Sequence, residues 1–216
     1  MTNKKIYSVL TLLIIIFGII VFSQAKKSLG IVVQPNDTPL ISSQAIYIPM
    51  DLSDPTVGSP GAAISIIEFG SIGCAECARV HAILYKFVQN NTAQVQLVWK
   101  DVPTTGLFSS GNFLSHQAAY CAGLQGRFWP FLNLAMNSND GLTESGLRTI
   151  ADELKLGATG WWQCATAEDT KHKMESAKEV ATALGVSTAP AIFINNKQIN
   201  LRADINLEDL LDRLLQ

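Results

Sequence analysis

The sequence has no long run of charge of one sign, and this absence limits the partners that the chain can bind. Its 216 residues carry 16 lysines and arginines against 18 aspartates and glutamates, a formal net charge of −2. Proteins that grip nucleic acid usually cluster basic residues on one face. A solvated surface of mixed charge and no nucleic-acid partner are therefore expected. The chain also has no internal repeat and no low-complexity tract, so one domain behind a targeting segment is the natural organisation.

Cysteine and histidine are scarce, and their spacing disfavours a metal site. The chain has four cysteines and three histidines, and among the cysteines Cys74 and Cys77 alone lie close together. A structural zinc site needs four ligands, usually supplied by a second close pair. Cys121 and Cys164 stand far apart in the sequence and cannot form such a pair locally. We expect no metal and no organic cofactor.

The N-terminus carries the one long apolar run. Residues 6–22 contain no charge and follow Lys4 and Lys5. The run is at the short end for a membrane span and longer than a typical signal-peptide core. The positive flank predicts that the rest of the chain lies outside the cytoplasm. Ala25 would also suit signal-peptide cleavage, so residues 1–25 are predicted to be a signal anchor or signal peptide, with the uncleaved anchor favoured.

The next part of the chain is predicted to connect this segment to a folded domain. Residues 26–45 mix polar residues and proline with aliphatic ones and are predicted to be a linker. A short edge strand is expected at 45–49. Residues 51–61 are rich in Asp, Ser, Pro and Gly, which predicts a loop of turns. The folded domain is therefore assigned to residues 46–216.

A strand–helix–strand unit is predicted around the close cysteine pair. The apolar run 62–69 predicts a buried central strand, and residues 95–100 predict a second one. Two strands joined by a helical crossover should be parallel. The helix between them should begin at about Cys74 and end at residue 88 or 89. Its apolar stripe comprises residues 77, 80, 81, 84, 87 and 88.

A block of helices and then a hairpin complete the predicted order. Helical periodicity covers 116–124 and 128–136, and further helices are expected from caps at Thr143, Thr166 and Asn206. Between the last two helices, a strand at 191–194 should turn through Asn195-Asn196 and pair with 198–201. This order predicts an α/β, thioredoxin-like fold with an all-helical insertion at about 108–184.

The segment Cys74-Ala75-Glu76-Cys77 carries the chemistry. Two thiols separated by two residues at a helix start can close into a disulfide with little backbone change. Unpaired N–H groups and the positive end of the helix dipole would stabilise a thiolate on the first sulfur. Cys74 is therefore predicted to be the exposed attacking sulfur. Cys77, one turn deeper, is predicted to resolve the mixed disulfide.

Two further residues are predicted to act beside this pair. Glu68 should point inward from its strand, where a buried carboxyl of raised pKa would exchange a proton with Cys77. The alternative is a glutamate at a strand end that reaches water. Pro190 begins the strand near the C-terminus, and a cis bond after Ala189 would leave backbone groups of Ala189 free to pair with a substrate. The alternative is an ordinary trans proline.

Together, these pieces resemble the DsbA-like branch of the thioredoxin superfamily from about residue 54 to the C-terminus. The resemblance is carried by Asp54-Pro55-Thr56-Val57-Gly58, Glu68-Phe69 ahead of the cysteine pair, Gln125-Gly126-Arg127-Phe128-Trp129 and Gly185-Val186-Ser187-Thr188-Ala189-Pro190. It implies an enzyme that exchanges disulfides with cysteine-containing exported proteins. In that enzyme Cys74 is the nucleophile, Cys77 the resolving thiol, Glu68 the buried acid and Pro190 the cis-proline.

The resemblance also implies a second disulfide and a redox partner. Some relatives carry a bridge in the helical block, which implies a Cys121–Cys164 bridge; two buried free thiols are the alternative. A membrane protein, quinone-linked in the family, would reoxidise the reduced enzyme. The enzyme is expected to be a monomer, held to the membrane through residues 6–22 or exported after cleavage.

The residues between the cysteines depart from the strong oxidases of this family. Those enzymes often carry Pro-His, whereas this chain has Ala75-Glu76. A carboxylate near a thiolate opposes it, so the pKa of Cys74 should be less depressed and the enzyme a milder oxidant. Ala189 replaces the Val or Thr that commonly precedes the proline. Ala75, Glu76 and Ala189 are predicted to contact the substrate.

The function predicted from the sequence is an extracytoplasmic thiol–disulfide oxidoreductase that works as an oxidase. A disulfide reductase or isomerase is the first alternative, and a copper-binding module using the same cysteines is the second. His81 is expected to be a satisfied, half-buried side chain, His116 is a weak candidate for the rim of the site, and His172 is expected to be solvated. The tryptophans expected to pack in the core or rim are Trp129, Trp161 and Trp162.

Overall fold

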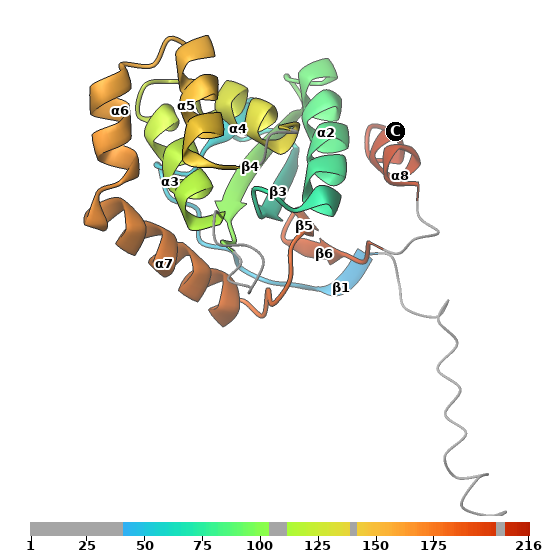
Figure 1. Cartoon of the computed structure of the whole chain (residues 1–216). Helices are drawn as coiled ribbons and strands as arrows, with labels where there is room; N and C mark the ends of the chain where they lie inside the picture. Colours follow the sequence, from blue (N-terminus) through green and yellow to red (C-terminus); the bar gives the residue numbers. More distant parts are fainter. Residues whose placement is uncertain (1–40, 104–111, 139–141, 202–205) are drawn as a thin grey trace, which may run out of the picture. The chain divides into compact units, whose positions relative to one another are not determined.

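The structure, a computed structural model, describes residues 41–103, 112–138, 142–201 and 206–216 (Figure 1). All of these residues belong to one unit, Pro39–Gln216. The predicted anchor or signal segment and most of the predicted linker lie outside the described residues. Within the described ranges, no helix is both long enough and apolar enough to cross a membrane.

A six-stranded sheet occupies the centre of this unit. Its strands in chain order are β1 (Ile41–Ala45), β2 (Thr56–Gly58), β3 (Ile64–Gly70), β4 (Val95–Asp101), β5 (Ala191–Ile194) and β6 (Lys197–Ile199). Their order across the sheet is β1-β6-β5-β3-β4-β2. β3 and β4 pair in parallel, as the crossover predicts, while β5 runs antiparallel to β3. Asn195 and Asn196 both have positive φ in the turn to β6, which confirms the predicted hairpin.

The two edge strands differ from the sequence prediction. β1 lies within the predicted linker, and the strand expected at 45–49 is wrong. Ile46 and Ile48 alternate as strand residues do, but they pack from an irregular segment against the sheet. β1 is instead a polar segment held by pairing with β6. β2 lies inside the predicted loop. It was not predicted as a strand, because its three residues, which pair with β4, are too few to show an apolar period.

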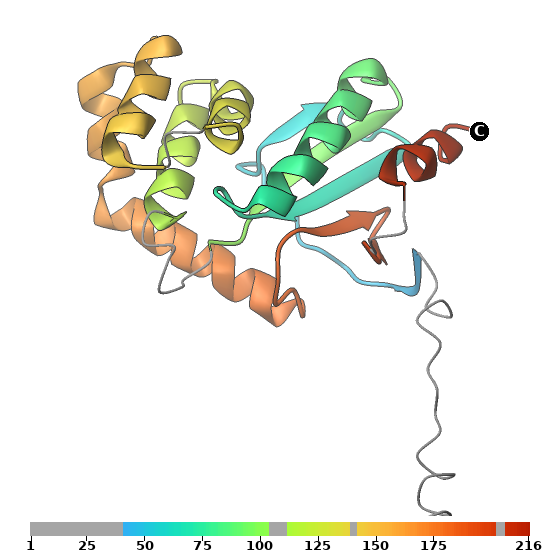
Figure 2. The same cartoon turned by 45° about the vertical axis from the view of Figure 1, so that its right-hand side comes forward.

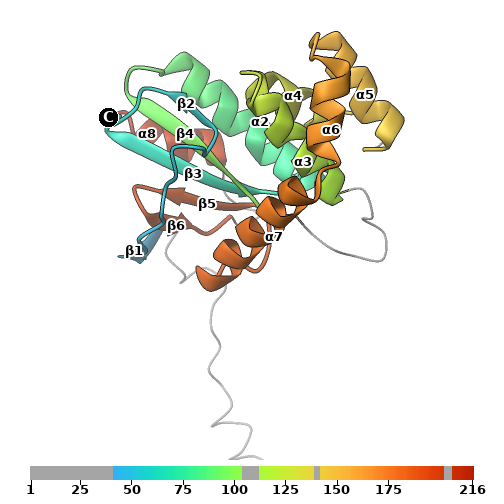
Figure 3. The same ribbon diagram turned by 90° about the vertical axis from the view of Figure 1, so that its left-hand side faces the viewer.

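Seven helices are described: α2 (Ala75–Asn90), α3 (Asn112–Gly123), α4 (Phe128–Met136), α5 (Glu144–Glu153), α6 (Ala158–Ala165), α7 (Glu168–Ala183) and α8 (Leu207–Arg213). α2 and α8 share an apolar cluster with one face of the sheet (Figure 2). α7 contributes to the cluster on the other face (Figure 3). The buried residues of α2 are the six of the predicted stripe, so this prediction is confirmed.

The inserted helices α3 to α6 pack around an apolar cluster that includes Phe131 and Trp161 and extends to Trp99 of β4. A disulfide between Cys121 and Cys164 joins α3 to α6. The sequence did not reveal α6, which has eight residues. Thr166 does not cap α7 as predicted; it ends α6, and its hydroxyl donates to the carbonyl of Trp162 at 2.8 Å.

Candidate active site

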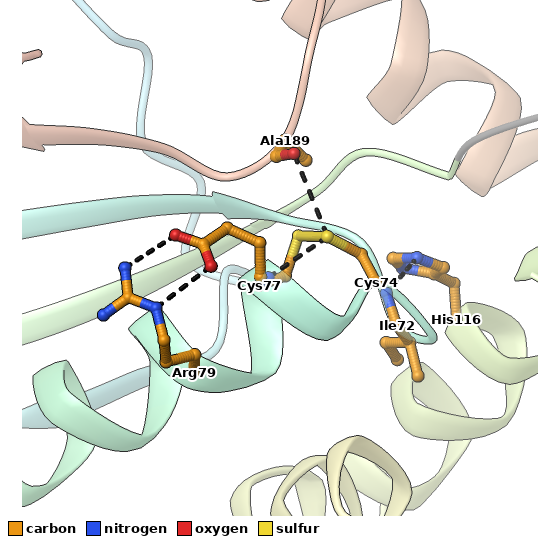
Figure 4. Close-up of a disulfide and its surroundings, with 7 residues drawn as sticks. Ile72, Cys74, Cys77, Arg79, His116 and Ala189 are labelled. Carbon is orange, nitrogen blue, oxygen red and sulfur yellow. Dashed lines mark hydrogen bonds and ion pairs between the residues drawn. A yellow bond between two sulfur atoms is a disulfide. The ribbon is translucent and has the colours of Figure 1, made fainter. Parts of the chain in front are cut away.

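The Cys74–Cys77 pair lies at the start of α2 and forms a disulfide (Figure 4). Cys74 is the N-cap residue, with extended backbone angles, and its Sγ accepts the backbone N–H of Cys77 at 3.1 Å. Cys74 is half-buried, whereas Cys77 is 0% exposed. The arrangement places one sulfur at the positive end of the helix within reach of solvent and the other in the core.

A buried histidine fixes the loop that leads into Cys74. Nε2 of His116 accepts the backbone N–H of Ile72 at 3.0 Å, so Nδ1 carries the ring hydrogen and donates to Asp101 at 2.5 Å. Asp101 also accepts the indole N–H of Trp99 at 2.7 Å. His116 is therefore a buried anchor rather than a residue of the site's rim. No local sequence pattern predicts this contact, because it joins α3 to the active-site loop.

The loop before β5 lies on the other side of Cys74. The Ala189–Pro190 peptide bond is cis, and the carbonyl oxygen of Ala189 lies 3.9 Å from Sγ of Cys74 (Figure 4). Ala189 and Pro190 are half-buried, while Ser187 and Thr188 are exposed. The backbone of Ala189 therefore lies beside the Cys74 sulfur.

Glu76, which lies between the two cysteines, is held by Arg79. The guanidinium donates to both carboxylate oxygens, at 3.0 and 2.6 Å. This hydrogen bonding lowers the pKa of Glu76, so the carboxylate stays charged but is paired. The expected opposition of Glu76 to a Cys74 thiolate is consequently offset by a positive charge three residues further along the helix. Arg79 was not among the predicted site residues, although its i,i+3 spacing from Glu76 is a signal for such a pair.

Glu68 faces α2 from β3 and is 0% exposed. Burial raises the pKa of its carboxyl, against the opposing effect of a hydrogen bond with His81. Oε2 lies 2.8 Å from Nδ1 of His81, and Oε1 has no hydrogen-bond partner within the described part of the chain. His81 is 1% exposed, so the expectation of a half-buried side chain is wrong. The apolar stripe of α2 carries this ring into the core beside Glu68.

The remaining predicted residues lie away from the cysteine pair. His172 is exposed on α7 and pairs with Glu175 at 2.9 Å. Trp161 is buried, and the guanidinium of Arg148 lies over the ring of Trp162. Trp129 differs from these residues, because its ring stacks on that of His81, the partner of Glu68.

Known proteins share this fold. A family model described as thioredoxin matches residues 51–213. Similar solved structures include a thioredoxin-like oxidoreductase from Silicibacter pomeroyi DSS-3, with a TM-score of 0.64, 23% identity, and coverage of 76% of this chain and 94% of that one. Wolbachia pipientis alpha-DsbA1 has a TM-score of 0.65 and 21% identity, covering 77% and 92%. A periplasmic thioredoxin-like protein from Salmonella enterica serovar Typhimurium has a TM-score of 0.65 and 17% identity, covering 78% and 91%.

The curated relatives are much longer proteins. The Na(+)/H(+) antiporter NhaA of Nitrosospira multiformis is 28% identical over 152 residues, which are 68% of this chain and 24% of that protein. NhaA 1 of Mycolicibacterium gilvum is 24% identical over 143 residues, which are 65% and 23%. The chain thus spans about a quarter of the length of the curated relatives it matches.

The family match covers most of the folded unit, and the chain belongs to the thioredoxin family. Its helical insertion in the sheet and its Cys-x-x-Cys disulfide at the start of α2 accompany a fold similar to that of alpha-DsbA1.

Proposed function

We propose that this chain oxidises cysteine-containing exported proteins outside the cytoplasm. The observation that carries the proposal is Sγ of Cys74 at the N-cap of α2, where it accepts the N–H of Cys77. Such a position stabilises the thiolate and therefore the reduced enzyme. A disulfide whose reduced form is stabilised is a better oxidant.

The difference in exposure between the two sulfurs sets the order of events. A substrate thiolate attacks Sγ of half-buried Cys74, the Cys74–Cys77 bond breaks, and Cys77 leaves as a thiolate that takes a proton from Glu68. A second substrate thiolate then attacks the substrate sulfur of this mixed disulfide. The substrate gains a disulfide, Cys74 leaves as a thiolate, and two electrons have passed to the enzyme.

The surface around Cys74 supplies the substrate contacts in this proposal. Ala75 and Glu76 flank the disulfide and are exposed. Ala189 and Pro190 lie opposite, and beyond them is a polar pocket of about 180 Å³. An extended peptide segment could pair with the backbone of Ala189 while its sulfur reaches Cys74.

Localisation and partner are part of the same proposal. The apolar run 6–22 behind two lysines supports a membrane anchor or an export signal with the catalytic domain outside the cytoplasm. The similar Salmonella protein is described as periplasmic. Reoxidation would then fall to a membrane redox protein, quinone-linked as in DsbA-like systems, with the enzyme acting as a monomer.

Incubation of the oxidised protein with a reduced two-cysteine peptide tests this function. We expect one peptide disulfide for each Cys74–Cys77 disulfide reduced and no reaction for Cys74→Ser. The Cys77→Ser variant has no such disulfide and is instead mixed with the oxidised peptide, whose disulfide the Cys74 thiolate should attack to leave a trapped mixed disulfide at Cys74. The double variant Cys121→Ser/Cys164→Ser is the matched control and should react as the unmodified protein does. If the Cys74→Ser variant reacted as fast as the unmodified protein, the proposed site would be wrong. Equilibration with glutathione fixes the direction: we expect a reduction potential below about −120 mV but well above about −270 mV, the value of a reductase.

A further inference from the structure

A buried chain of hydrogen bonds runs from Glu68 towards the surface. Oε2 of Glu68 contacts Nδ1 of His81 at 2.8 Å, and Nε2 of the same ring lies 3.0 Å from Oδ1 of Asn133. Asn133, on α4, is half-buried. The chain therefore begins at an inaccessible carboxyl and ends at a side chain that solvent reaches.

The two hydrogen bonds of His81 define how many protons the buried pair holds. Oδ1 of Asn133 is an acceptor, so Nε2 carries a hydrogen. The contact between Nδ1 and Glu68 then needs one more proton, which lies on the ring or on the carboxyl. Glu68 and His81 share this proton as a unit, while Oε1 of Glu68 faces the core with no partner in the described part of the chain.

The surroundings of the pair are aromatic and apolar. Trp99 is the β4 residue beside Glu68 and contacts the His81 ring edge-on at 5.8 Å, and Ile192 lies across from Glu68 on β5. From α4, Trp129 stacks on His81 at 6.0 Å. The titratable groups nearby are Cys77 and Tyr85 on α2, the Tyr85 ring at 5.7 Å from His81, and, beyond Trp99, the His116–Asp101 pair. Among these groups, His81 is the one that lowers the pKa of Glu68, first through its hydrogen bond.

We propose that His81 is a positioning residue for Glu68: its hydrogen bond to Oε2 stabilises the carboxylate that removes the proton from Cys77, and its contact with Asn133 holds the ring in place. The inference rests on the proposed thiol–disulfide exchange and concerns the step in which Cys77 attacks. The Cys77 thiol passes its proton to the Glu68 carboxylate. The Cys77 thiolate then attacks Sγ of Cys74 in a mixed disulfide, the Cys74–Cys77 bond forms, and the bound thiol leaves as a thiolate.

Removing His81 and favouring its protonated form should have opposite effects on the ionisation of Glu68. Without His81, the hydrogen bond and the positive charge that favour the carboxylate are lost, so less Glu68 is ionised at a given pH. Replacing Asn133 by Asp places a carboxylate on Nε2 and favours the imidazolium form. That charge favours ionised Glu68. Damage to packing alone would not move the pH midpoint of the reaction rate up in one variant and down in the other.

The experiment starts from the reduced full-length protein and oxidised glutathione, and measures the rate at which Cys77 releases glutathione from Cys74 as a function of pH. For His81→Leu we expect the midpoint to move up by about one to two pH units, with the rate recovering at high pH. For Asn133→Asp we expect it to move down. His172→Leu, at the exposed histidine of α7, is the matched control and should leave the midpoint in place.

Three outcomes are informative. Opposite shifts for His81→Leu and Asn133→Asp support the positioning role of His81. An unmoved midpoint in both variants, whatever the overall rate, overturns it, and Asn133→Asp keeps this test available if His81→Leu does not fold. Failure of the unmodified protein to form any glutathione adduct at Cys74 would instead overturn the proposed exchange reaction.

Discussion

Arg79 binds both carboxylate oxygens of Glu76 and thereby places a guanidinium against the carboxylate that lies between the two cysteines. The pair is half-exposed, so solvent and salt screen its effect. The negative charge between the two cysteines is nonetheless not isolated. Electrostatics at Cys74 depends on both members of this pair.

Arg79→Gln should raise the pKa of Cys74 and make the disulfide a weaker oxidant. The change leaves the Glu76 carboxylate without its cation, and an unpaired negative charge disfavours a nearby thiolate. Glu76→Gln should lower the pKa of Cys74. Alkylation rate against pH measures both shifts, which should shrink in high salt. Identical Cys74 titrations in the two variants would contradict this electrostatic account.

Replacing His116 by Ala should loosen the loop before Cys74. The variant removes the acceptor of the Ile72 N–H in a buried site, which costs about 1–3 kcal/mol of folding free energy. Denaturant unfolding measures the loss, and hydrogen exchange at the Ile72 amide should become faster. His172→Ala, at an exposed histidine, should stay within about 0.5 kcal/mol. Equal losses in the two variants would show that His116 does not anchor the loop.

Removal of the Cys121–Cys164 bridge should lower stability without abolishing exchange at Cys74. The bridge closes a loop with a sequence separation of 43 residues, and the chain-entropy model assigns such a loop about 4 kcal/mol. Thermal or denaturant unfolding of Cys121→Ser/Cys164→Ser measures this loss. An unchanged free energy of unfolding would mean that the helical insertion does not depend on the bridge.

Glu68→Gln should stabilise the oxidised protein increasingly as pH rises. Burial raises the folded-state pKa of Glu68 above its ordinary value of 4.5, so between 4.5 and the folded-state value the folded chain binds the extra proton. Stability from this group is therefore present below pH 4.5 and is lost as pH rises, by about 1 kcal/mol per pH unit within the window. Denaturant unfolding of Glu68→Gln and of the unmodified protein, at acid and at neutral pH, measures the difference in their free energies of unfolding. A difference in unfolding free energy that stays constant with pH would contradict the raised pKa of the buried carboxyl.

Local patterns predicted the elements that hold the cysteine pair. β3 is a short apolar run, the stripe of α2 has a helical period, and Asn195-Asn196 marks the hairpin turn. β1 and β2 could not be found in this way, because a polar edge strand and a three-residue strand are defined by their pairing partners. α6 is too short for periodicity to separate it from its neighbours.

The candidate site was predicted in its sulfur chemistry and missed in its hydrogen-bond partners. The spacing of Cys74 and Cys77 is a local signal, and the inward direction of Glu68 follows from strand alternation. The contact between Glu68 and His81 depends on how α2 sits over β3. The anchoring of Ile72 by His116 bridges 44 positions of sequence. Such contacts are products of tertiary packing and have no period of their own.

The central claim is that the start of α2 stabilises a Cys74 thiolate. Titration of the Cys74 thiol in the reduced Cys77→Ser variant, where no second active-site thiol interferes, tests it most directly. We predict a Cys74 pKa well below the ordinary value of about 8.5. A pKa at or above that value would contradict the account.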